Sequence, residues 1–160
     1  MTKRQASLTL LTLTALAVGV WLICRKRMNT KGTNPVTGRI SSKFGNRTAP
    51  TAGASTNHNG VDIAVPIGTH VVAPWDGTVQ SVWTDNGGGL SLAIAHPNGY
   101  RTGYCHLSSV LVSKGDKVKQ GQDVALSGNS GRTTGPHLHF TVTDPSGRKI
   151  DPETMFDFKA

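Results

Sequence analysis

Glycine-rich turns recur every few residues along most of this chain, and they limit the length of any regular element that can form between them. The chain has 160 residues, of which 19 are glycine. From residue 39 onward, apolar or alternating runs of four to eight residues are separated by clusters of Gly, Pro, Asn and Asp. Short runs at this spacing predict an all-β domain. No part of this region has the sustained 3.6-residue period of a helix.

Eight runs are expected to form strands: 39–44, 61–64, 70–73, 78–83, 90–95, 100–107, 124–127 and 138–143. The strongest hairpin signal is Asn98-Gly99, because this dipeptide favours a tight turn between two strands. Short strands joined by such turns predict an antiparallel β-sandwich or a partly open barrel. The glycine-rich segment 127–135 is expected to lie close to an extended ligand in a groove.

The N-terminal segment has a different character. Residues 8–24 form an uncharged, mostly apolar run with basic residues on both sides. Extended back to Gln5, the run approaches the ~20 residues that span a bilayer. Trp21 suits a membrane interface. We therefore expect one N-terminal transmembrane helix that contacts the membrane through residues 5–24. A cleaved signal peptide is the alternative, although its small-x-small motif at 15–17 would lie in the middle of the run.

These patterns predict three parts: residues 1–32 as a membrane anchor with basic flanks, 33–38 as a linker, and 39–160 as the folded domain. The formal charge of +8 belongs mostly to the first part, because residues 1–32 hold six basic side chains and no acid. The rest carries 11 basic and nine acidic side chains. A nucleic-acid partner is therefore not expected, since it would need a basic face on the folded domain.

The residues that point to a chemical function are histidines and one aspartate. His58 and Asp62, with one histidine of the pair His137 and His139, would form a set of two nitrogens and one oxygen. Such a set suits Zn²⁺ and leaves one coordination position open. On an extended segment His58, Gly60 and Asp62 share a face, and glycine leaves room for a metal. The other histidine of the pair, together with His106, would remain for acid–base work.

The remaining histidines and the cysteines are interpreted as structural. His70 and His96 lie next to turns and outside the motifs. Cys24 and Cys105 are not expected to pair. Because neighbouring side chains on a strand point to opposite faces, Cys105 is expected to pack behind His106 as a small apolar residue.

Together these motifs resemble the M23 zinc metallopeptidases, the lysostaphin-type or LytM-type peptidoglycan endopeptidases. The resemblance runs from about residue 40 to residue 156, and only segment 47–57 looks individual to this chain. Its motifs are Ser-Lys-Phe-Gly (42–45), His-Asn-Gly-Val-Asp-Ile-Ala-Val-Pro (58–66), Tyr-Cys-His-Leu-Ser (104–108) and Ser-Gly-Arg-Thr-Thr-Gly-Pro-His-Leu-His-Phe (130–140). The resemblance implies that His58, Asp62 and His139 are the ligands of one zinc ion, and that His106 and His137 are catalytic.

The resemblance further implies a zinc-dependent endopeptidase that hydrolyses peptide cross-links or stem peptides of bacterial peptidoglycan, for wall remodelling or for opening a host wall from a virus particle. A glutamate base is not expected, because Glu153 is the only glutamate and His-Glu-x-x-His is absent. One alternative is a non-catalytic LytM-type module that binds the wall or activates a hydrolase. A second is a lipoyl-type carrier module, suggested by segment 115–122.

The peptidoglycan substrate and the anchor together predict a domain on the extracytoplasmic side, periplasmic or facing the wall, or one held in a virion membrane. The basic residues around the apolar run favour the opposite orientation. Those after the run outnumber those before it, and the positive-inside rule places the more basic flank in the cytoplasm. The sequence leaves this conflict and the bond that is cleaved open.

Overall fold

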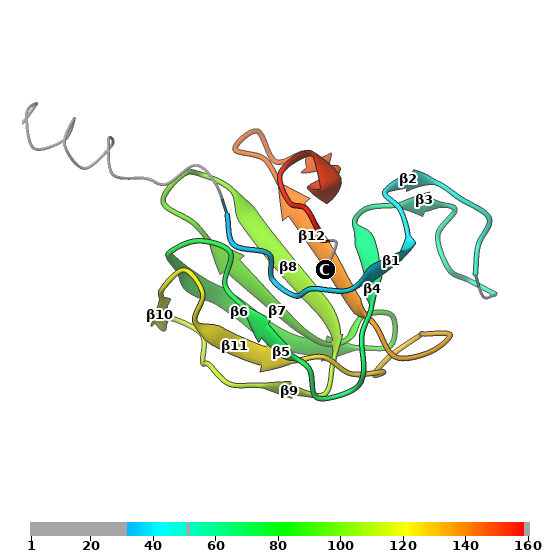
Figure 1. The fold of residues 1–160 in the computed structure, drawn as a ribbon, viewed down its shortest axis with the longest axis horizontal. Coiled ribbons are helices and arrows are strands. Elements are labelled where there is room, and N and C mark those ends of the chain that lie inside the picture. The colour runs from blue at the N-terminus through cyan, green and yellow to red at the C-terminus, as the bar shows by residue number, and fades with distance from the viewer. Residues whose placement is uncertain (1–31, 51, 159–160) are drawn as a thin grey trace, which may run out of the picture. The chain divides into compact units, whose positions relative to one another are not determined.

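The computed structural model describes residues 32–50 and 52–158, and every strand pair among them is antiparallel (Figure 1). The predicted all-β antiparallel class is therefore confirmed. The predicted transmembrane helix falls on residues 1–31, which lie outside the described residues. Within the described ranges, no helix has the length and apolar character needed to cross a membrane.

The described elements, in chain order, are β1 (Arg39–Ser42), β2 (Gly45–Asn46), β3 (Asn57–His58), β4 (Val61–Ala64), β5 (His70–Val72), β6 (Gly77–Asp85), β7 (Gly89–Ala95), β8 (Arg101–Leu107), β9 (Ser109–Val110), β10 (Lys117–Val118), β11 (Asp123–Leu126), β12 (Leu138–Thr143), β13 (Lys149–Ile150) and a single 3-10 turn, η1 (Pro152–Thr154). Each of the eight expected strands has a counterpart. The five short strands β2, β3, β9, β10 and β13 were not expected, because two residues are too few to show an alternating pattern.

One large sheet carries the domain. Its strands follow the order β1-β4-β12-β8-β7-β6-β10, and β13 pairs with β12. The edge strands β1 and β10 do not pair with each other, so the described strands form no closed barrel. A smaller sheet, β5-β11-β9, and the ribbon β2-β3 complete the described strands.

The core lies between the large and the small sheet. On the large sheet, Leu92, Tyr104 and Phe140 are fully buried, and on the small sheet Val71 and Val124 belong to the same apolar cluster. These large side chains alternate along their strands with residues on the opposite face, as strand geometry requires. Burial of one such side chain stabilises the fold by roughly 1.5–3 kcal/mol. The other face of the large sheet is thereby left free for a site.

The hairpin predicted at Asn98-Gly99 is confirmed, and it joins β7 to β8. The amide of Gly99 donates to the carbonyl of His96, and the amide of His96 donates to the carbonyl of Tyr100. Gly99 has a φ of 84°, a left-handed conformation that glycine adopts at little cost.

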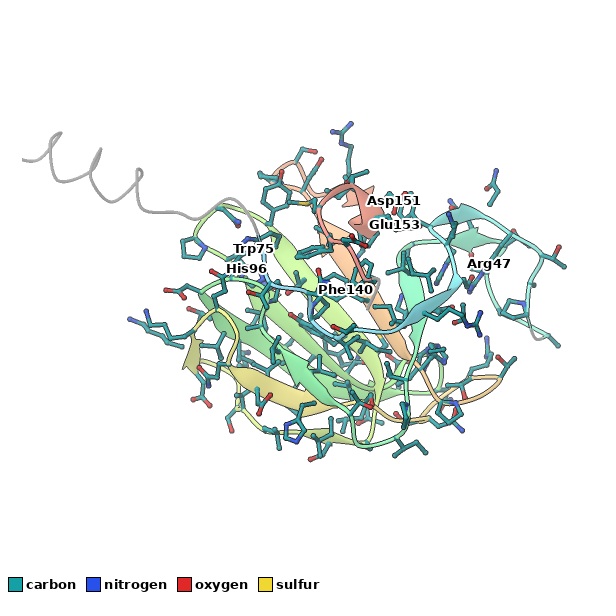
Figure 2. The ribbon with its side chains drawn as sticks, viewed as in Figure 1. Arg47, Trp75, His96, Phe140, Asp151 and Glu153 are labelled. Atoms are coloured by element: carbon teal, nitrogen blue, oxygen red, sulfur yellow. The ribbon has the colours of Figure 1, made fainter. Side chains whose placement is uncertain are left out.

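The segment expected to be a linker, 33–38, contacts the domain. The amide of Thr33 donates to the carbonyl of Pro74, and the side chain of Val36 is buried in the core. At the other end, the side chain of Asp151 caps η1 by accepting from the amide of Glu153 (Figure 2). The boundaries of the three expected parts remain a prediction.

His96 gives the fold a measurable pH dependence. Its ring is buried edge-on to Trp75, and its nitrogens contact the carbonyl of Asp76 and the hydroxyl of Thr102 at 2.9 and 2.8 Å (Figure 2). Burial lowers the pKa of His96 below its ordinary value of 6.5, although the hydrogen bond to Asp76 opposes the shift. The folded protein therefore keeps this ring neutral at pH values where the unfolded chain protonates it.

We expect the free energy of unfolding to decrease as pH falls below 6.5, toward the lowered pKa of folded His96, because the unfolded chain then binds the extra proton. His96→Gln should lose about 1–2 kcal/mol at pH 8, where its hydrogen bonds are fully present. The difference in free energy of unfolding between wild type and variant should become smaller as the pH is lowered. Urea unfolding from pH 8 to pH 5 measures the free energy of unfolding of both proteins. A difference between them that stays constant with pH would contradict the coupling of His96 protonation to unfolding.

Candidate metal centre

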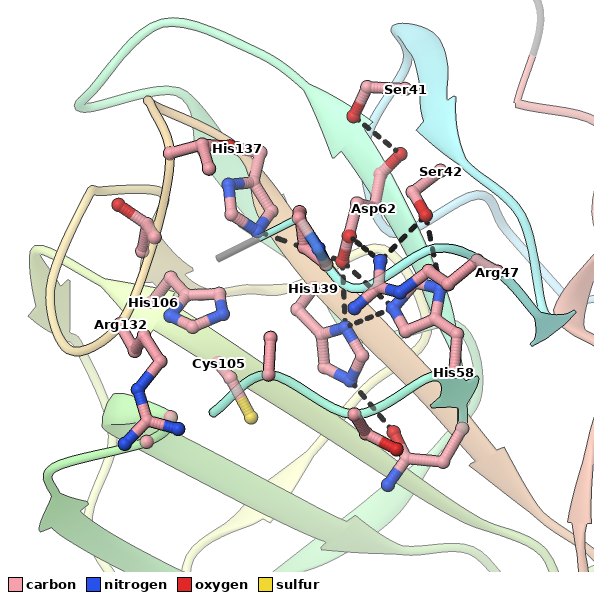
Figure 3. A pocket seen from close by; sticks show the side chains of 18 of the residues that line it. Ser41, Ser42, Arg47, His58, Asp62, Cys105, His106, Arg132, His137 and His139 are labelled. Carbon is pink, nitrogen blue, oxygen red and sulfur yellow. Dashed lines mark hydrogen bonds and ion pairs between the residues drawn. The ribbon is translucent and has the colours of Figure 1, made fainter. Parts of the chain in front are cut away.

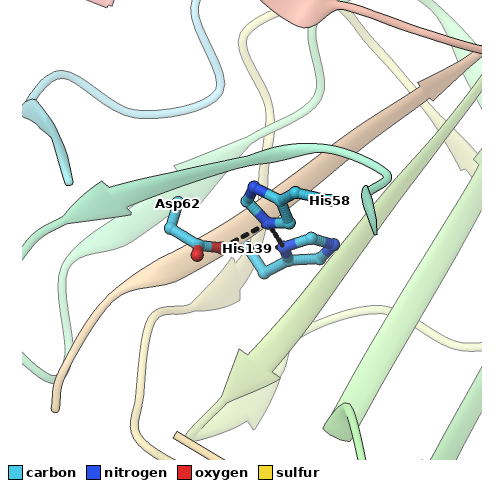
Figure 4. A group of neighbouring side chains, drawn as sticks. All are labelled: His58, Asp62 and His139. Atoms are coloured by element: carbon cyan, nitrogen blue, oxygen red, sulfur yellow. Dashed lines mark hydrogen bonds and ion pairs between the residues drawn. The ribbon is translucent and has the colours of Figure 1, made fainter. Parts of the chain in front are cut away.

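Strand pairing brings the expected metal ligands together. Asp62 on β4 lies directly opposite His139 on β12, and His58 on β3 approaches from the neighbouring ribbon (Figure 4). Nδ1 of His139 lies 2.8 Å from Oδ1 of Asp62. Nε2 of His58 lies 3.0 Å from that nitrogen and 3.2 Å from that oxygen. Three donor atoms of three residues thus meet at one point.

The outer contacts of the two imidazoles determine which nitrogens are free. Nδ1 of His58 lies 2.7 Å from the carbonyl oxygen of Lys43, and Nε2 of His139 lies 3.1 Å from Oδ1 of Asn59. Both partners are acceptors, so in the neutral imidazoles these nitrogens carry the protons. The lone pairs of His58 Nε2 and His139 Nδ1 then face each other and the carboxylate. Three electron-rich atoms so close together fit a bound cation, and their N/N/O chemistry suits Zn²⁺.

The charge states agree with this geometry. Burial alone would raise the pKa of Asp62, but hydrogen bonds and charge from His139 and His58 outweigh it, and the pKa lies well below its ordinary value. Burial lowers the pKa of His139, against the opposing influence of Asp62. A carboxylate beside a neutral imidazole is the protonation state in which both can bind a metal.

Arg47 completes the surroundings of Asp62. Its Nη1 lies 2.9 Å from Oδ2 of Asp62 and 2.6 Å from the hydroxyl of Ser42 (Figure 3). The ion pair is mostly buried, with side-chain exposures of 20% for Arg47 and 13% for Asp62. Arg47 therefore occupies one carboxylate oxygen and leaves Oδ1 to point at the two histidines. The sequence interpretation assigned no role to Arg47, because 15 positions separate it from Asp62.

An extended segment was expected between His58 and Asp62, but the backbone bends there. β3 ends at His58, the chain bends at residues 59–60, and β4 begins at Val61. A Cβ atom on Gly60 would lie 2.3 Å from the carbonyl oxygen of Phe140. Glycine is thus required there because β12 passes close by, which differs from the expected reason that a side chain would obstruct the metal.

The two remaining motif histidines face the same point from the other side (Figure 3). The ring centroids of His106 and His137 lie 4.7 Å apart, and those of His106 and His139 lie 6.0 Å apart. Nδ1 of His106 lies 2.8 Å from the carbonyl of Ser130, and Nδ1 of His137 lies 2.8 Å from that of Gly135. Both acceptors belong to the glycine-rich segment 127–135. This segment therefore leaves the Nε2 atoms of both rings available.

His106 has an unusual backbone that corrects one prediction. It is the one non-glycine residue with positive φ among the described residues, at 63°. This left-handed conformation breaks the alternation of β8, so Cys105 and His106 both line the same groove. The prediction that Cys105 packs behind His106 is therefore wrong. Burial raises the pKa of the Cys105 thiol, which keeps it protonated and poorly nucleophilic.

The five residues lie in a groove of about 700 Å³. One wall comes from residues within 47–50 and 53–57, which include Arg47, and the other from residues 132–134. Nη1 of Arg132 donates to the carbonyl of Gly53 at 2.6 Å, which ties the two walls together. Described residues of the segment that looks individual in the sequence thus line the groove that holds the five motif residues.

His70, His96 and Glu153, which were not expected to take part in the chemistry, lie outside this groove. His70 is exposed and lies 3.0 Å from Asp123, and His96 is the buried core residue described above. Glu153 lies on η1 and is paired with Lys43 at 3.8 Å (Figure 2). Glu153, the one glutamate of the sequence, is not among the residues that line the groove.

Comparison with known proteins gives consistent matches. Residues 56–152 match the sequence profile of Peptidase family M23. The chain is 48% identical over 105 residues to peptidoglycan DD-endopeptidase ShyA of Vibrio cholerae, covering 65% of this chain and 24% of that protein. The chain spans about a quarter of the length of the curated relatives it matches first.

Two solved structures have the same fold. A zinc-containing peptidase from Vibrio cholerae superposes with a TM-score of 0.68 at 40% identity, over 83% of this chain and 40% of that one. The catalytic domain of lysostaphin from Staphylococcus simulans superposes with a TM-score of 0.66 at 33% identity, over 73% of this chain and 90% of that domain. The latter agrees with the expected lysostaphin-type architecture.

Arg47→Met should weaken zinc binding about 10-fold, because residues that orient a metal ligand typically contribute that much to affinity. Competition with a chromogenic chelator measures the change. Arg132→Met is the matched control, since Arg132 lines the same groove and contacts a backbone carbonyl instead of a carboxylate. Equal zinc affinity of Arg47→Met and wild type would contradict the orienting role of Arg47.

Proposed function

The chain belongs to Peptidase family M23, and from this membership we propose that it is a zinc-dependent endopeptidase that hydrolyses peptide cross-links or stem peptides of bacterial peptidoglycan. The names of its relatives support this substrate, since ShyA is a peptidoglycan DD-endopeptidase and shares 48% identity over the matched region. The catalytic domain of lysostaphin has the same fold, so this fold supports catalysis in a similar protein.

One observation carries the proposal. Two nitrogens and one oxygen converge within 3.2 Å of one another, and the Nε2 atoms of two further histidines are left available beside them. A structural zinc site would have four protein ligands and would need no free acid–base groups next to it. Here three ligands would hold the ion, and His106 and His137 would serve the reaction.

His58, Asp62 and His139 would hold the zinc ion. When bound, Zn²⁺ supplies Lewis acidity, which polarises a peptide carbonyl and makes water a better nucleophile near neutral pH. The protein supplies orientation: Lys43, Asn59 and Arg47 hold the three ligands from outside. The low pKa of Asp62 maintains its negative charge at the metal.

Proton transfer would fall to His106 and His137. Burial lowers the pKa of His106, so its Nε2 can accept a proton from water near neutral pH. Nε2 of His137 lies 3.6 Å from Oδ1 of Asp62, which places it beside the metal ligands. One of the two rings would take the proton of the attacking water, and the other would stabilise the oxyanion or protonate the leaving amine. The backbone carbonyls of Ser130 and Gly135 accept from the Nδ1–H groups of the two rings, so the ring that takes the proton presents an unprotonated Nε2. The ring that donates would be in the imidazolium form, which carries a proton on both nitrogens.

A wall-binding or hydrolase-activating module without catalysis is the second candidate. Such a module does not need five side chains that converge on one point, nor histidines whose tautomers are fixed by hydrogen bonds. A lipoyl-type carrier is disfavoured for the same reason, because it would not use the donor set of His58, Asp62 and His139. The peptidase is therefore the better explanation of this site.

A peptidoglycan substrate also bears on location. We propose that residues 39–160 act on the extracytoplasmic side, periplasmic or facing the wall, or are held in a virion membrane, with residues 5–24 as the anchor. The uncharged run of residues 8–24 supports the anchor. Protease accessibility of the folded domain in intact and in permeabilised cells would test the topology.

His139→Ala should lose both zinc and activity, because it removes a metal ligand. His106→Ala should keep zinc and lose about 10²- to 10⁴-fold in turnover, the usual contribution of a general acid or base. Mass spectrometry of fragments released from purified peptidoglycan, with and without a zinc chelator, gives the activity and identifies the bond. Metal analysis of the same samples gives the zinc content.

His70→Ala is the matched control, since it removes an exposed histidine outside the groove and should leave zinc and turnover unchanged. Retained turnover in His106→Ala would refute the catalytic role of His106. Failure of the zinc-loaded wild type to release any fragment from walls of several cross-link types would favour the non-catalytic module.

A further inference from the structure

A second recess lies beside the metal centre, on the open face of the large sheet. It has a volume of about 350 Å³ and shares Asn59, Cys105 and His139 with the groove described above. The two cavities are therefore neighbours with a common wall. The proposed chemistry uses only the first of them.

Small residues at four paired positions make the floor of this recess. Thr141 on β12 lies opposite Gly103 on β8, Gly103 opposite Ala93 on β7, and Ala93 opposite Ser81 on β6. These four strands lie side by side in Figure 1. Large side chains of the same strands are buried on the other face. Large side chains thus cover the core face of the sheet, while the small side chains on its open face leave room for a ligand.

Two cations line the recess. Lys149 on β13 and Arg101 on β8 both lie opposite Thr143 of β12, so the two basic residues flank one strand at the same level. Nζ of Lys149 donates to the hydroxyl of Thr141 at 3.0 Å, which directs the ammonium over the floor. Nη1 of Arg101 contacts Oε1 of Gln80 at 3.4 Å.

No acidic residue balances these charges. The lining contains neither Asp nor Glu, and no ion pair among the described residues includes Arg101 or Lys149. Burial, and then the charge of Arg101, lowers the pKa of Lys149. Two uncompensated cations around a polar hollow attract an anion, and a carboxylate can accept from both.

We propose that the recess formed by Arg101, Lys149 and Thr141 is a subsite for a carboxylate of the peptide substrate, an inference that rests on the proposed endopeptidase function. Thr141 follows His139 by two residues on β12, which corresponds to about 7 Å along a strand. An extended peptide advances about 3.3–3.6 Å per residue. The recognised carboxylate therefore belongs about two residues from the scissile bond, or at the end of a long side chain nearer to it.

The test uses two cross-linked stem-peptide fragments of identical sequence, one with free side-chain carboxylates and one with these groups amidated. The zinc-loaded wild type should cleave the free form with a kcat/KM about 10-fold higher, the usual effect of a hydrogen bond to a charged group. Lys149→Met and Arg101→Gln should lose most of this preference, and Lys149→Arg should retain it. Arg148→Met is the matched control, because Arg148 is an exposed neighbour paired with Asp144 outside the recess.

Binding of the same two peptides, followed by NMR shifts of the Gly103 and Thr141 amides, separates this proposal from the peptidase function. Shifts caused only by the free-carboxylate peptide and lost in Lys149→Met support the subsite even if neither peptide is cleaved. Cleavage at equal rates for both peptides, unchanged in Lys149→Met and Arg101→Gln, overturns the subsite and leaves the peptidase function standing. Absence of both cleavage and binding overturns both.

Discussion

The antiparallel pairing of β4 with β12 is the constraint on which the rest of the site depends. It sets Asp62 directly across from His139, and β3 then brings His58 within 3.2 Å of both. Cross-strand partners on one face of a sheet have their Cβ atoms about 4.5–5.5 Å apart, so short side chains can converge on one ion without a flexible linker. Gly60 permits this approach, because any side chain there would strike the carbonyl of Phe140.

Backbone carbonyls hold most of the functional histidines. Lys43, Ser130 and Gly135 each accept a hydrogen bond from one imidazole, and Asn59 accepts the fourth. Main-chain acceptors are fixed by the fold and lose no side-chain entropy when they orient a ring. The glycine-rich segment therefore has a chemical role in addition to forming part of the groove. His106 is held at both its backbone and its ring, because its amide donates to the carbonyl of Gly88 at 2.7 Å and its Nδ1 contacts the carbonyl of Ser130.

The two faces of the large sheet have different roles, since one packs in the core and the other carries the site. Its inner face holds Tyr104 and Phe140 in the core, while its outer face holds the metal donors Asp62 and His139 and the hollow beside them. Strand alternation produces this division wherever large and small residues alternate. Because both recesses lie on the same rigid strands, a peptide bound across them would be held in a defined register relative to the metal.

The sequence alone determined the all-β class, the eight longer strands, the Asn98-Gly99 hairpin and the five histidine and aspartate residues that meet in the groove, because each of these leaves a local pattern. It could not determine the contacts of Arg47 with Asp62, of Ser130 with His106, or of Lys149 with Thr141, which join residues on different elements. It also placed Cys105 on the wrong face, because alternation assumes a regular strand and His106 departs from one. Those features were decided by the tertiary structure, since strand register and loop packing fix which distant atoms meet and no local pattern encodes them.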